Sequence, residues 1–406
     1  MKLRIAFLTA ESVTEGAFDG GLANYLNRVI KGLHLRNHEI EIFTISLKNE
    51  TVEHNGMIIH RIKPEAKWYS LIYRFMGKYL SGFRWILLEA YCLNKIFNEK
   101  HKKNPFDIVQ IPNYRASGLF LVIQNKIPTV TRISSYAKLY NEAYERKRDI
   151  DVRLQEWLEE VNIKKSFKCY APSNYLAEII FKRSNKNIDV LKPLFFIDIS
   201  PDQYNHKLYA SRLKNKQYIF YFGAVSRLKG IFILNKALEK ILDGNQDINF
   251  VFAGEDIPYK NESCVKKVLD ALEKYGKRII YFNALQHTEL YPILMNSRVV
   301  VFPSLVDNIP NTCLEAMAHG CIVVASNGAS LDELIKDGES GILFKLGDPV
   351  SLAEKILYAW NLPDSERKTI SDNAKKAIEK LAPETALKEL EDYYVKAVEK
   401  WENREI

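Results

Sequence analysis

The sequence lacks the features that define several classes of protein. Its five cysteines are odd in number and form no C-x-x-C pair, so neither a disulfide framework nor a zinc site is expected. Glycine supplies 18 of 406 residues, far fewer than a collagen-like repeat needs. The hydrophobic share of 47% is higher than in disordered chains. We therefore expect a globular protein in a reducing compartment, the cytoplasm.

Long hydrophobic runs are also missing. The apolar run Leu3–Thr9 is short, and the acidic residues Glu11, Glu15 and Asp19 follow it without a small-residue cleavage site. This pattern predicts a β-strand rather than a signal peptide. No segment has the length and apolar character of a transmembrane helix.

The length and the distribution of charge indicate more than one domain. At roughly 150 residues per domain, 406 residues predict two to three domains. Residues 1–200 contain 31 Lys and Arg against 21 Asp and Glu, a balance of +10, whereas the remainder has 27 against 29, or −2. A basic first half favours an anionic partner or a solvated basic face. Nucleic acid is disfavoured, because no known binding module or dense basic run is present.

Strand-like and helix-like segments alternate through both halves of the chain. Apolar residues recur at helical spacing after Gly21, and short apolar runs of strand length stand on either side of that segment. Such β-α-β units build parallel sheets covered by helices. We predict two Rossmann-like α/β domains facing a central cleft, with ligands at the carboxyl ends of the strands. The predicted strands are 3–9, 39–45, 107–111, 129–133, 218–223, 249–253, 278–282, 298–302 and 321–326.

Two loops contain residues suited to an anionic ligand. Gly20 and Gly21 lie where the first loop meets a helix, so backbone N–H groups there can approach a ligand closely. A plain tight turn explains them equally well, and the G-x-G-x-x-G pattern is absent. Arg227 and Lys229 lie between a predicted strand and the next helix, a position that suits a diphosphate. Solvated surface cations are the alternative.

A third loop, Pro303–Gly320, contains the longest pattern. Asn311 is a suitable N-cap, which would leave the N–H groups of the next three residues free for phosphate oxygens. Asp307 and Glu315 stand eight residues apart on either side of this helix start. Two such carboxylates can accept hydrogen bonds from hydroxyl groups at two ends of one ligand. Acidic residues that complement the helix dipole explain Glu315 alone.

Together the three loops resemble glycosyltransferase family 4, whose members have the two-domain GT-B fold. Residues 307–315 are similar to the E-x7-E signature of the family, with Asp in the first place. The resemblance spans nearly the whole chain and is strongest from Pro303 to Asp348. It implies a retaining transfer of a sugar from a nucleotide-sugar donor, with UDP slightly preferred, and without a metal or another cofactor.

The resemblance implies a role for each matching residue. Glu315 would bind the ribose hydroxyls, Lys229 the diphosphate, and Asp307 the hydroxyls of the donor sugar, while Gly20 and Gly21 would face the leaving phosphate or the acceptor. The donor-binding residues implied in this way are Gly20, Gly21, Arg227, Lys229, Asn308, Ile309, Pro310, Asn311, Thr312 and Glu315.

Three positions depart from the family pattern. Ala224 stands where the family has Arg, and we expect Arg227 to supply that charge. Ser134 stands where the family has a His near the reaction centre. Asp307 is one methylene shorter than the usual Glu. Asp307 and Ser134 are therefore the candidate catalytic residues.

The resemblance also implies a domain division. We predict an acceptor-side domain over residues 1–195, a donor domain over 196–380 and a terminal helix over 381–406 that packs back on the first domain. An apolar stripe at helical spacing supports that helix. Its members are Leu387, Leu390, Tyr394, Ala397 and Trp401.

Residues 67–91 are rich in aromatic and basic side chains. At about 100° per residue, Lys67, Arg74 and Lys78 share one stripe of a helix, and apolar residues such as Tyr69 and Ile72 lie opposite. A helix of this kind can lie in a membrane interface, so one hypothesis is that the first domain docks peripherally on the cytoplasmic face of a membrane. The alternative is that these side chains pack within the first domain.

The sequence therefore predicts a metal-independent glycosyltransferase, of hexose or another sugar, that acts in surface polysaccharide or lipopolysaccharide assembly. Its partners would be a nucleotide-sugar donor and a glycan or lipid-linked acceptor. Two alternatives stay open. One is a non-catalytic nucleotide-sugar-binding subunit, which Ala224 and Ser134 make plausible. The other is a nucleotide-sugar epimerase on the same GT-B fold.

Overall fold

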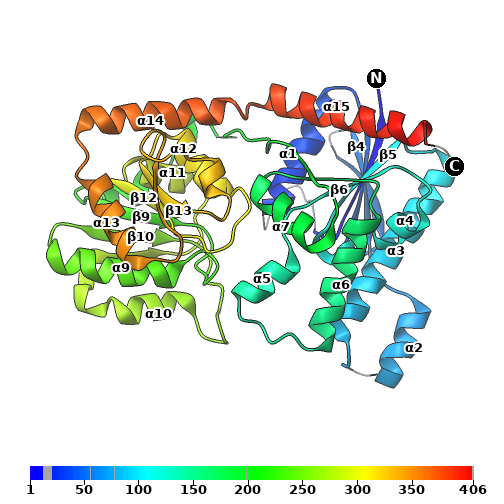
Figure 1. The fold of residues 1–406 in the computed structure, drawn as a ribbon, viewed down its shortest axis with the longest axis horizontal. Helices are drawn as coiled ribbons and strands as arrows, with labels where there is room; N and C mark the ends of the chain where they lie inside the picture. The colour runs from blue at the N-terminus through cyan, green and yellow to red at the C-terminus, as the bar shows by residue number, and fades with distance from the viewer. Residues whose placement is uncertain (12–20, 55, 77, 198, 405–406) are drawn as a thin grey trace. The chain divides into compact units, whose positions relative to one another are not determined.

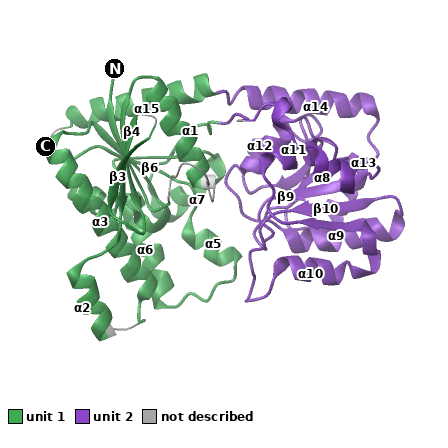
Figure 2. Cartoon of the chain, turned by 180° about the vertical axis from the view of Figure 1, so that it is seen from behind, with its two compact units in different colours: residues 1–194, 383–406 green, residues 195–382 purple. Residues whose placement is uncertain are grey.

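The chain forms two compact units, which Figure 2 shows in different colours. The computed structural model describes residues 1–11, 21–54, 56–76, 78–197 and 199–404. Unit 1 comprises residues 1–194 and 383–406, and unit 2 comprises residues 195–382. The boundary expected from the sequence, after residue 195, differs from this division by one residue.

Unit 1 contains an eight-stranded sheet in the order β3-β4-β2-β1-β5-β6-β7-β8. Its neighbouring strands are parallel, apart from the antiparallel pair β3 and β4. The described strands are β1 (Arg4–Thr9), β2 (Glu39–Ile45), β3 (Glu50–His54), β4 (Met57–Ile62), β5 (Ile108–Pro112), β6 (Thr129–Arg132), β7 (Lys168–Ala171) and β8 (Asp189–Val190).

Helices cover the sheet of unit 1 (Figure 1). Apolar residues of α3 and α4 pack with β1, β2 and β5 in one core cluster, and α7 packs with β7 and with Ile133, directly after β6, in another. The described helices are α1 (Gly21–Leu35), α2 (Lys67–Met76), α3 (Ser81–Lys103), α4 (Leu119–Gln124), α5 (Ala137–Ala143), α6 (Ile150–Lys165), α7 (Asn174–Ser184) and α15 (Pro383–Glu402).

Unit 2 contains a six-stranded parallel sheet in the order β11-β10-β9-β12-β13-β14. The central strands are continuous apolar runs and are buried along their length, as parallel strands covered on both faces must be. The strands are β9 (Tyr218–Phe222), β10 (Asn249–Ala253), β11 (Ile279–Phe282), β12 (Val299–Phe302), β13 (Val323–Asn327) and β14 (Ile342–Lys345).

The main core of unit 2 lies between this sheet and helices α11, α12 and α14. On the other side α9 lies against α13 (Figure 1). The fold-class prediction of α/β with two parallel-sheet domains is confirmed. The helices of unit 2 are α8 (Lys207–Arg212), α9 (Ile231–Gly244), α10 (Cys264–Ala271), α11 (His287–Met295), α12 (Asn311–Ala318), α13 (Pro349–Trp360) and α14 (Asp364–Glu379).

The terminal helix α15 belongs to unit 1 and lies against α1. A Cβ atom on Gly32 of α1 would stand 2.5 Å from Leu387 Cδ1, so a larger residue there would require the Leu387 side chain to move. Tyr394 is fully buried, and its hydroxyl donates to Gln110 of β5. Trp401 packs edge-on against Phe167 at 5.0 Å between ring centroids. Helix α15 is thus part of the core of unit 1.

The periodicity predicted a single helix over the aromatic and basic segment 67–91. The structure does not have one. The segment is divided between α2 and α3, and Leu80, just before α3, has a left-handed φ of 51°. Trp68 and Tyr69 pack on the α3 core cluster, with Trp68 edge-on to Tyr91 at 5.7 Å. Beyond this docking point Leu71 and residues 73–75 of α2 are exposed, and Ile72 is partly buried.

The five cysteines are buried and free. Within the described ranges, none of the helices combines the length and the low charge of a bilayer-spanning segment.

Candidate functional site

The loops that follow β9 and β12 meet at the carboxyl edge of the sheet in unit 2, because these two strands are neighbours. The N–H of Leu305 donates to the carbonyl of Leu228 at 2.8 Å and joins the two loops. Gly230 has a φ of +73°, and a Cβ there would stand 1.8 Å from the Pro303 carbonyl oxygen. Only glycine fits this turn, which brings Lys229 alongside the second loop.

Asp307 and Lys229 form the centre of this site. Lys229 Nζ lies 2.6 Å from Asp307 Oδ2, and Ser304 Oγ donates to the same oxygen at 2.9 Å. The N–H of Asn308 donates to Oδ1 at 3.0 Å. The carboxylate is buried, whereas the lysine side chain keeps 32% of its exposed area. A fixed buried anion therefore holds a cation that solvent and a ligand can reach.

Helix α12 begins at Asn311, so the prediction that Asn311 is the N-cap is wrong. Pro310 occupies the cap position, and its carbonyl accepts hydrogen bonds from the N–H groups of Cys313 and Leu314. These two groups were expected to be available to a ligand. The N–H groups of Asn311 and Thr312 stand at the very start of the helix, where the dipole favours an anion.

The loop before α12 has an unusual backbone. Ile309 is a β-branched residue with a left-handed φ of 51°, which side chains of this type rarely adopt. Its N–H donates to Ser330 Oγ at 2.7 Å. Ser330 itself has a φ of 65° in the loop after β13. Sequence reasoning missed Ser330, although Gly328 directly after a strand was a signal for a special turn.

Glu315 is buried one turn into α12, as predicted. His287, at the start of α11, lies beside it, with Nε2 3.7 Å from Glu315 Oε1. His287 was not recognised in the sequence, although a polar residue that opens a helix after a strand of a parallel sheet is a signal for this edge. Glu315 and the pair of Lys229 and Asp307 all belong to unit 2.

Arg227 lies on the same loop as Lys229 but faces a different neighbour. Its guanidinium carbon stands 4.9 Å from the ring centroid of Tyr259. Ala224, which takes the place of the family's Arg, has its carbonyl bound by the Tyr221 hydroxyl at 2.6 Å. The structure thus brings Lys229, Asp307, Asn308, Ile309, Pro310 and the start of α12 together, with Arg227 beside them.

The candidate residues of unit 1 lie elsewhere. Gly21 is the first residue of α1, and Gly20 lies outside the described residues. Ser134 follows β6, and its N–H donates to Asn113 Oδ1 at 2.8 Å, while its hydroxyl donates to the same oxygen at 3.4 Å. Asn113 Nδ2 donates in turn to the Ser135 carbonyl at 2.5 Å and to Glu159. Ser134 is therefore held mainly through its backbone.

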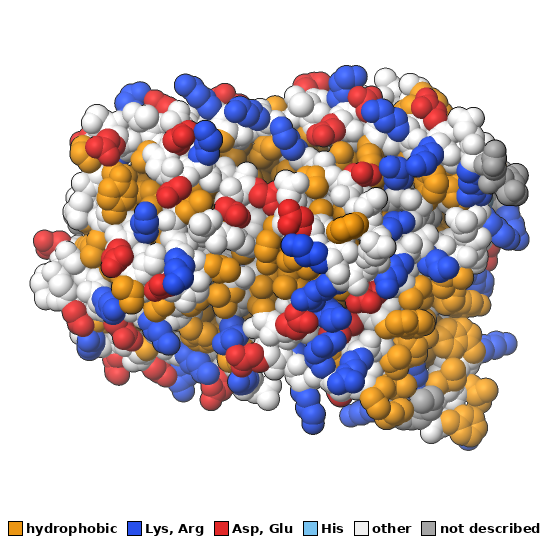
Figure 3. Space-filling model, viewed as in Figure 1, with side chains coloured by type: hydrophobic (Ala, Val, Ile, Leu, Met, Phe, Trp, Pro, Cys, Tyr) orange, Lys and Arg blue, Asp and Glu red, His pale blue; other side chains and the backbone are white. Residues whose placement is uncertain are grey.

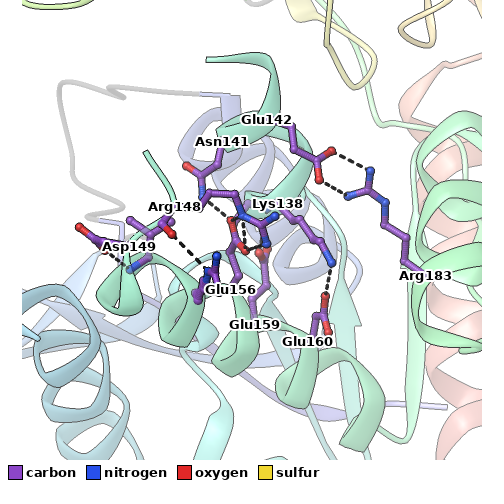
Figure 4. Close-up of polar contacts among 12 residues, drawn as sticks. Lys138, Asn141, Glu142, Arg148, Asp149, Glu156, Glu159, Glu160 and Arg183 are labelled. Carbon is purple, nitrogen blue, oxygen red and sulfur yellow. Dashed lines mark hydrogen bonds and ion pairs between the residues drawn. The ribbon is translucent and has the colours of Figure 1, made fainter. Parts of the chain in front are cut away.

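Glu159 is the buried centre of this second cluster, whose surroundings Figure 4 shows. Its Oε2 accepts from the Ala137 N–H, at the start of α5, at 2.8 Å. Burial raises the pKa of Glu159 from 4.5 to about 8, although the hydrogen bonds from Ala137 and Asn113 oppose the rise. Sequence reasoning missed both Asn113 and Glu159, since neither belongs to a recognisable motif.

Ion pairs surround this cluster and join α5, α6 and α7 (Figure 4). Arg148 contacts Glu156 through Nε at 3.2 Å and through a terminal nitrogen at 2.5 Å. Arg183 of α7 lies 2.8 Å from Glu142 of α5. Glu156 is buried, whereas the Arg148 side chain keeps 36% of its exposed area, so this ion pair reaches the surface.

Arg132 is a further charged residue at the end of β6. It is buried, and its guanidinium carbon stands 3.7 Å from the ring centroid of Tyr25. The Tyr25 hydroxyl lies 2.8 Å from that of Tyr170, whose hydroxyl donates to Gln110 at 2.9 Å. No group of three or more His, Cys, Asp and Glu side chains suited to a metal ion occurs in the described part of the chain.

Comparison with known proteins shows which proteins this chain is similar to. Residues 209–377 match the family model "Glycosyl transferases group 1". An uncharacterized glycosyltransferase of Methanocaldococcus jannaschii is 23% identical over 94% of this chain and 95% of its own length. The lipopolysaccharide 1,2-N-acetylglucosaminetransferase of Salmonella typhimurium is 30% identical, over 39% of this chain and 43% of its own length.

Solved structures share the fold of the whole chain. The sucrose-phosphate synthase of Thermosynechococcus elongatus has a TM-score of 0.76 at 17% identity, covering 97% of this chain and 98% of its own. The Anabaena protein HepE, solved in complex with UDP and glucose, has a TM-score of 0.72 at 16% identity, covering 97% and 100%. The second unit of this chain is thus similar to the group 1 glycosyl transferases, and the chain has the GT-B fold of these solved structures.

Proposed function

We propose that this protein is a retaining, metal-independent glycosyltransferase that moves a hexose or another sugar from a nucleotide-sugar donor to a glycan or lipid-linked acceptor. The observation that carries the proposal is the contact between Lys229 and buried Asp307, 2.6 Å apart, at the carboxyl edge of the unit 2 sheet. Glu315 follows Asp307 by eight residues and lies one turn into α12. This combination offers a cation for a diphosphate and carboxylates for hydroxyl groups.

The chemistry requires charge stabilisation at the leaving group. When the glycosidic bond breaks, the diphosphate gains negative charge, and a preorganised cation stabilises it most in the transition state. Lys229 is held in place by Asp307 and can exchange that contact for a phosphate oxygen. Asp307 then accepts hydrogen bonds from the donor sugar, and the first N–H groups of α12 hold further phosphate oxygens.

The other candidate residues are assigned to the nucleotide, the sugars and the acceptor. Glu315 accepts from the ribose hydroxyls, with His287 beside it. Arg227 supplies the second positive charge near the diphosphate. Ser134 contacts the reacting sugars through its hydroxyl, and Gly20 and Gly21 face the leaving phosphate or the acceptor. Glycosyltransferase family 4 remains the subfamily that we propose within group 1.

Relatives support the substrate classes. The HepE structures contain UDP, glucose and UDP-glucose, which favours a UDP-sugar as the donor of this protein. The Salmonella relative acts on lipopolysaccharide, and a Staphylococcus aureus relative, 25% identical, acts in capsular polysaccharide biosynthesis. Both favour a role in surface polysaccharide or lipopolysaccharide assembly. Five free cysteines favour the cytoplasm, and a lipid-linked acceptor favours a location at its membrane face.

The test is to incubate the purified protein with UDP-, GDP- and ADP-sugars and to measure nucleoside diphosphate release, with and without a membrane-lipid extract and with and without EDTA. Release from one donor that rises with the extract and survives EDTA is the expected result. Acceptor-independent release with an isomerised free sugar would support an epimerase instead. Nucleotide binding without release from any donor would support a non-catalytic subunit.

A further inference from the structure

Helix α2 presents an unusual surface of unit 1. It extends away from the sheet, and hydrophobic side chains gather over this part of the molecule (Figures 1 and 3). Phe75 keeps 81% of its exposed area and Leu71 57%. Tyr73 and Tyr79 are also exposed. We call these four side chains, with the exposed cations beside them, the α2 patch. Large apolar side chains that cluster on a surface mark an interaction site.

The α2 patch is rich in positive charge and contains no negative charge of its own. Residues 67–88 include four basic residues and no Asp or Glu. Lys67, Arg74 and Lys78 are exposed. At helical spacing Lys67, Leu71, Arg74 and Phe75 share one face, so cations and apolar side chains alternate on the outward side. The apolar residues expected opposite these cations, Tyr69 and Ile72, are partly buried, whereas Leu71 and Phe75 are exposed.

The inner side of α2 is already occupied. Trp68 and Tyr69 pack on the core of unit 1, and Tyr69 contacts Trp85 edge-on at 6.1 Å between ring centroids. The nearest acidic side chain at the start of α3, Asp151, accepts the N–H groups of Gly82 and Phe83 at 3.0 and 2.8 Å. The Asp151 carboxylate is thus bound to the first N–H groups of α3. The outward face is left with apolar groups and cations.

We infer that the α2 patch docks unit 1 on an anionic lipid bilayer. Leu71 and Phe75 would enter the boundary between headgroups and acyl chains, and Tyr73 and Tyr79 would lie at headgroup level with their hydroxyls in water. Lys67, Arg74 and Lys78 would pair with anionic headgroups. The absence of acidic residues from 67–88 and the protruding shape of α2 match a flat anionic surface better than a folded protein partner. This inference deepens the proposed function and rests on it for the need to reach a lipid-linked acceptor.

The experiment is vesicle flotation of the full-length protein without any nucleotide sugar. Vesicles of phosphatidylcholine alone are compared with vesicles in which about a third of the lipid is phosphatidylglycerol. We expect binding to the anionic vesicles at low salt, and loss of binding as salt is raised. Failure to bind anionic vesicles would overturn the inference and leave the transferase proposal, which is tested by nucleotide release, untouched.

Two pairs of matched variants assign the binding to this surface. Leu71→Ser with Phe75→Ser should weaken vesicle binding by about tenfold or more, whereas Leu35→Ser with Leu47→Ser, at equally exposed positions of unit 1, should not change it. Loss of binding by the control pair alone would overturn the assignment. All four side chains are exposed, so unchanged thermal unfolding is expected and confirms folding.

The charges are tested in the same way. Replacing Lys67, Arg74 and Lys78 by Gln should weaken binding by about tenfold or more, whereas the same change at Lys31, Lys102 and Lys103 should have a much smaller effect. Equal effects of the two sets would show a diffuse charge attraction and overturn the assignment to α2. A concentration-dependent dimer that Phe75→Ser abolishes, without vesicle binding, would instead identify a protein contact.

Discussion

In unit 2, the loops after neighbouring strands β9 and β12 hold Lys229 against buried Asp307 and leave the lysine partly exposed. In unit 1, the loops after neighbouring strands β5 and β6 hold Asn113 and Ser134, but there the buried carboxylate of Glu159 receives hydrogen bonds from Asn113 and from the backbone at Ala137. Both clusters stand at the carboxyl edge of a parallel sheet. One has a charged group available to a ligand, and the other is satisfied internally.

The difference teaches that position in the fold does not by itself define a binding site. A polar group in a loop contributes to ligand binding when the interaction with its protein partner is strong enough to hold it in place and weak enough to be replaced by a contact with the ligand. Lys229 meets this condition, because its partner is a single carboxylate that has two further donors, Ser304 and the Asn308 N–H. Asn113 does not, since its amide bridges Ser134, Ser135 and Glu159.

The largest expected effect comes from Lys229→Met. In the proposed reaction Lys229 stabilises the leaving diphosphate, so its removal should lower turnover by roughly 10²- to 10³-fold. The measurement is nucleoside diphosphate release at saturating donor. Lys236→Met, at an exposed position of α9 in the same unit, is the matched control and should keep full turnover. Full activity of Lys229→Met would remove the main distinction between the two clusters.

Glu315→Gln should act on binding more than on turnover. A hydrogen bond to a charged group contributes about 1.5–3 kcal/mol, so nucleotide affinity should fall by about 10- to 100-fold. Isothermal titration with UDP measures the change, and Glu366→Gln on α14 serves as the exposed control. Unchanged UDP affinity would place the ribose away from α12.

How much of each cluster the sequence reveals depends on how local its contacts are. Asp307 and Glu315 stand on one short loop and helix, so a spacing pattern could indicate them. Asn113 and Glu159 are 46 residues apart and meet only after α6 packs on the sheet, so no pattern in the sequence joins them. The α/β class was predictable from alternating apolar segments, because parallel strands covered on both faces must be apolar throughout.

Other details depend on a single backbone conformation. The break between α2 and α3 is at Leu80, whose left-handed φ could not be read from a continuous helical periodicity. The error at Asn311 has a similar cause, because Pro310 with extended φ and ψ serves as the cap and its carbonyl binds the first turn. Ile309 reaches Ser330 across 21 residues, a contact that only the packing of β13 beside β12 creates.

Glu159→Gln sharpens the comparison from the side of unit 1. The variant cannot accept both hydrogen bonds, so it should be less stable than the native protein by about 1–2 kcal/mol at about pH 5. Because the pKa of folded Glu159 is about 8 and that of the unfolded residue 4.5, the native protein loses stability as pH rises between these values. The deficit of the variant should therefore shrink toward about pH 9.

Thermal unfolding of both proteins at the two pH values measures this difference. Glu366→Gln provides the control, since its exposed carboxylate should show the same difference from the native protein at both. A deficit that stays the same at both pH values would mean that Glu159 is already ionised in the folded protein at about pH 5. The cluster of unit 1 would then contain a fixed charge, like that of unit 2.

Ser134→Ala should have the smallest effect on turnover of these variants. It tests whether the cluster of unit 1, unlike that of unit 2, has no direct part in catalysis. The Ser134 N–H, at 2.8 Å from Asn113 Oδ1, keeps the loop in place, and alanine retains it. The hydroxyl contact of 3.4 Å is long and adds little. With the loop intact, the variant loses only the contact that we propose between the hydroxyl and the reacting sugars, so turnover should fall by about threefold to tenfold. Thermal stability should stay within about 0.5 kcal/mol of the native value.

A loss of about 10²-fold or more at unchanged stability would show that the hydroxyl takes part in the chemical step, as the family's histidine position suggests. The edge of unit 1 would then contribute to catalysis as directly as Lys229.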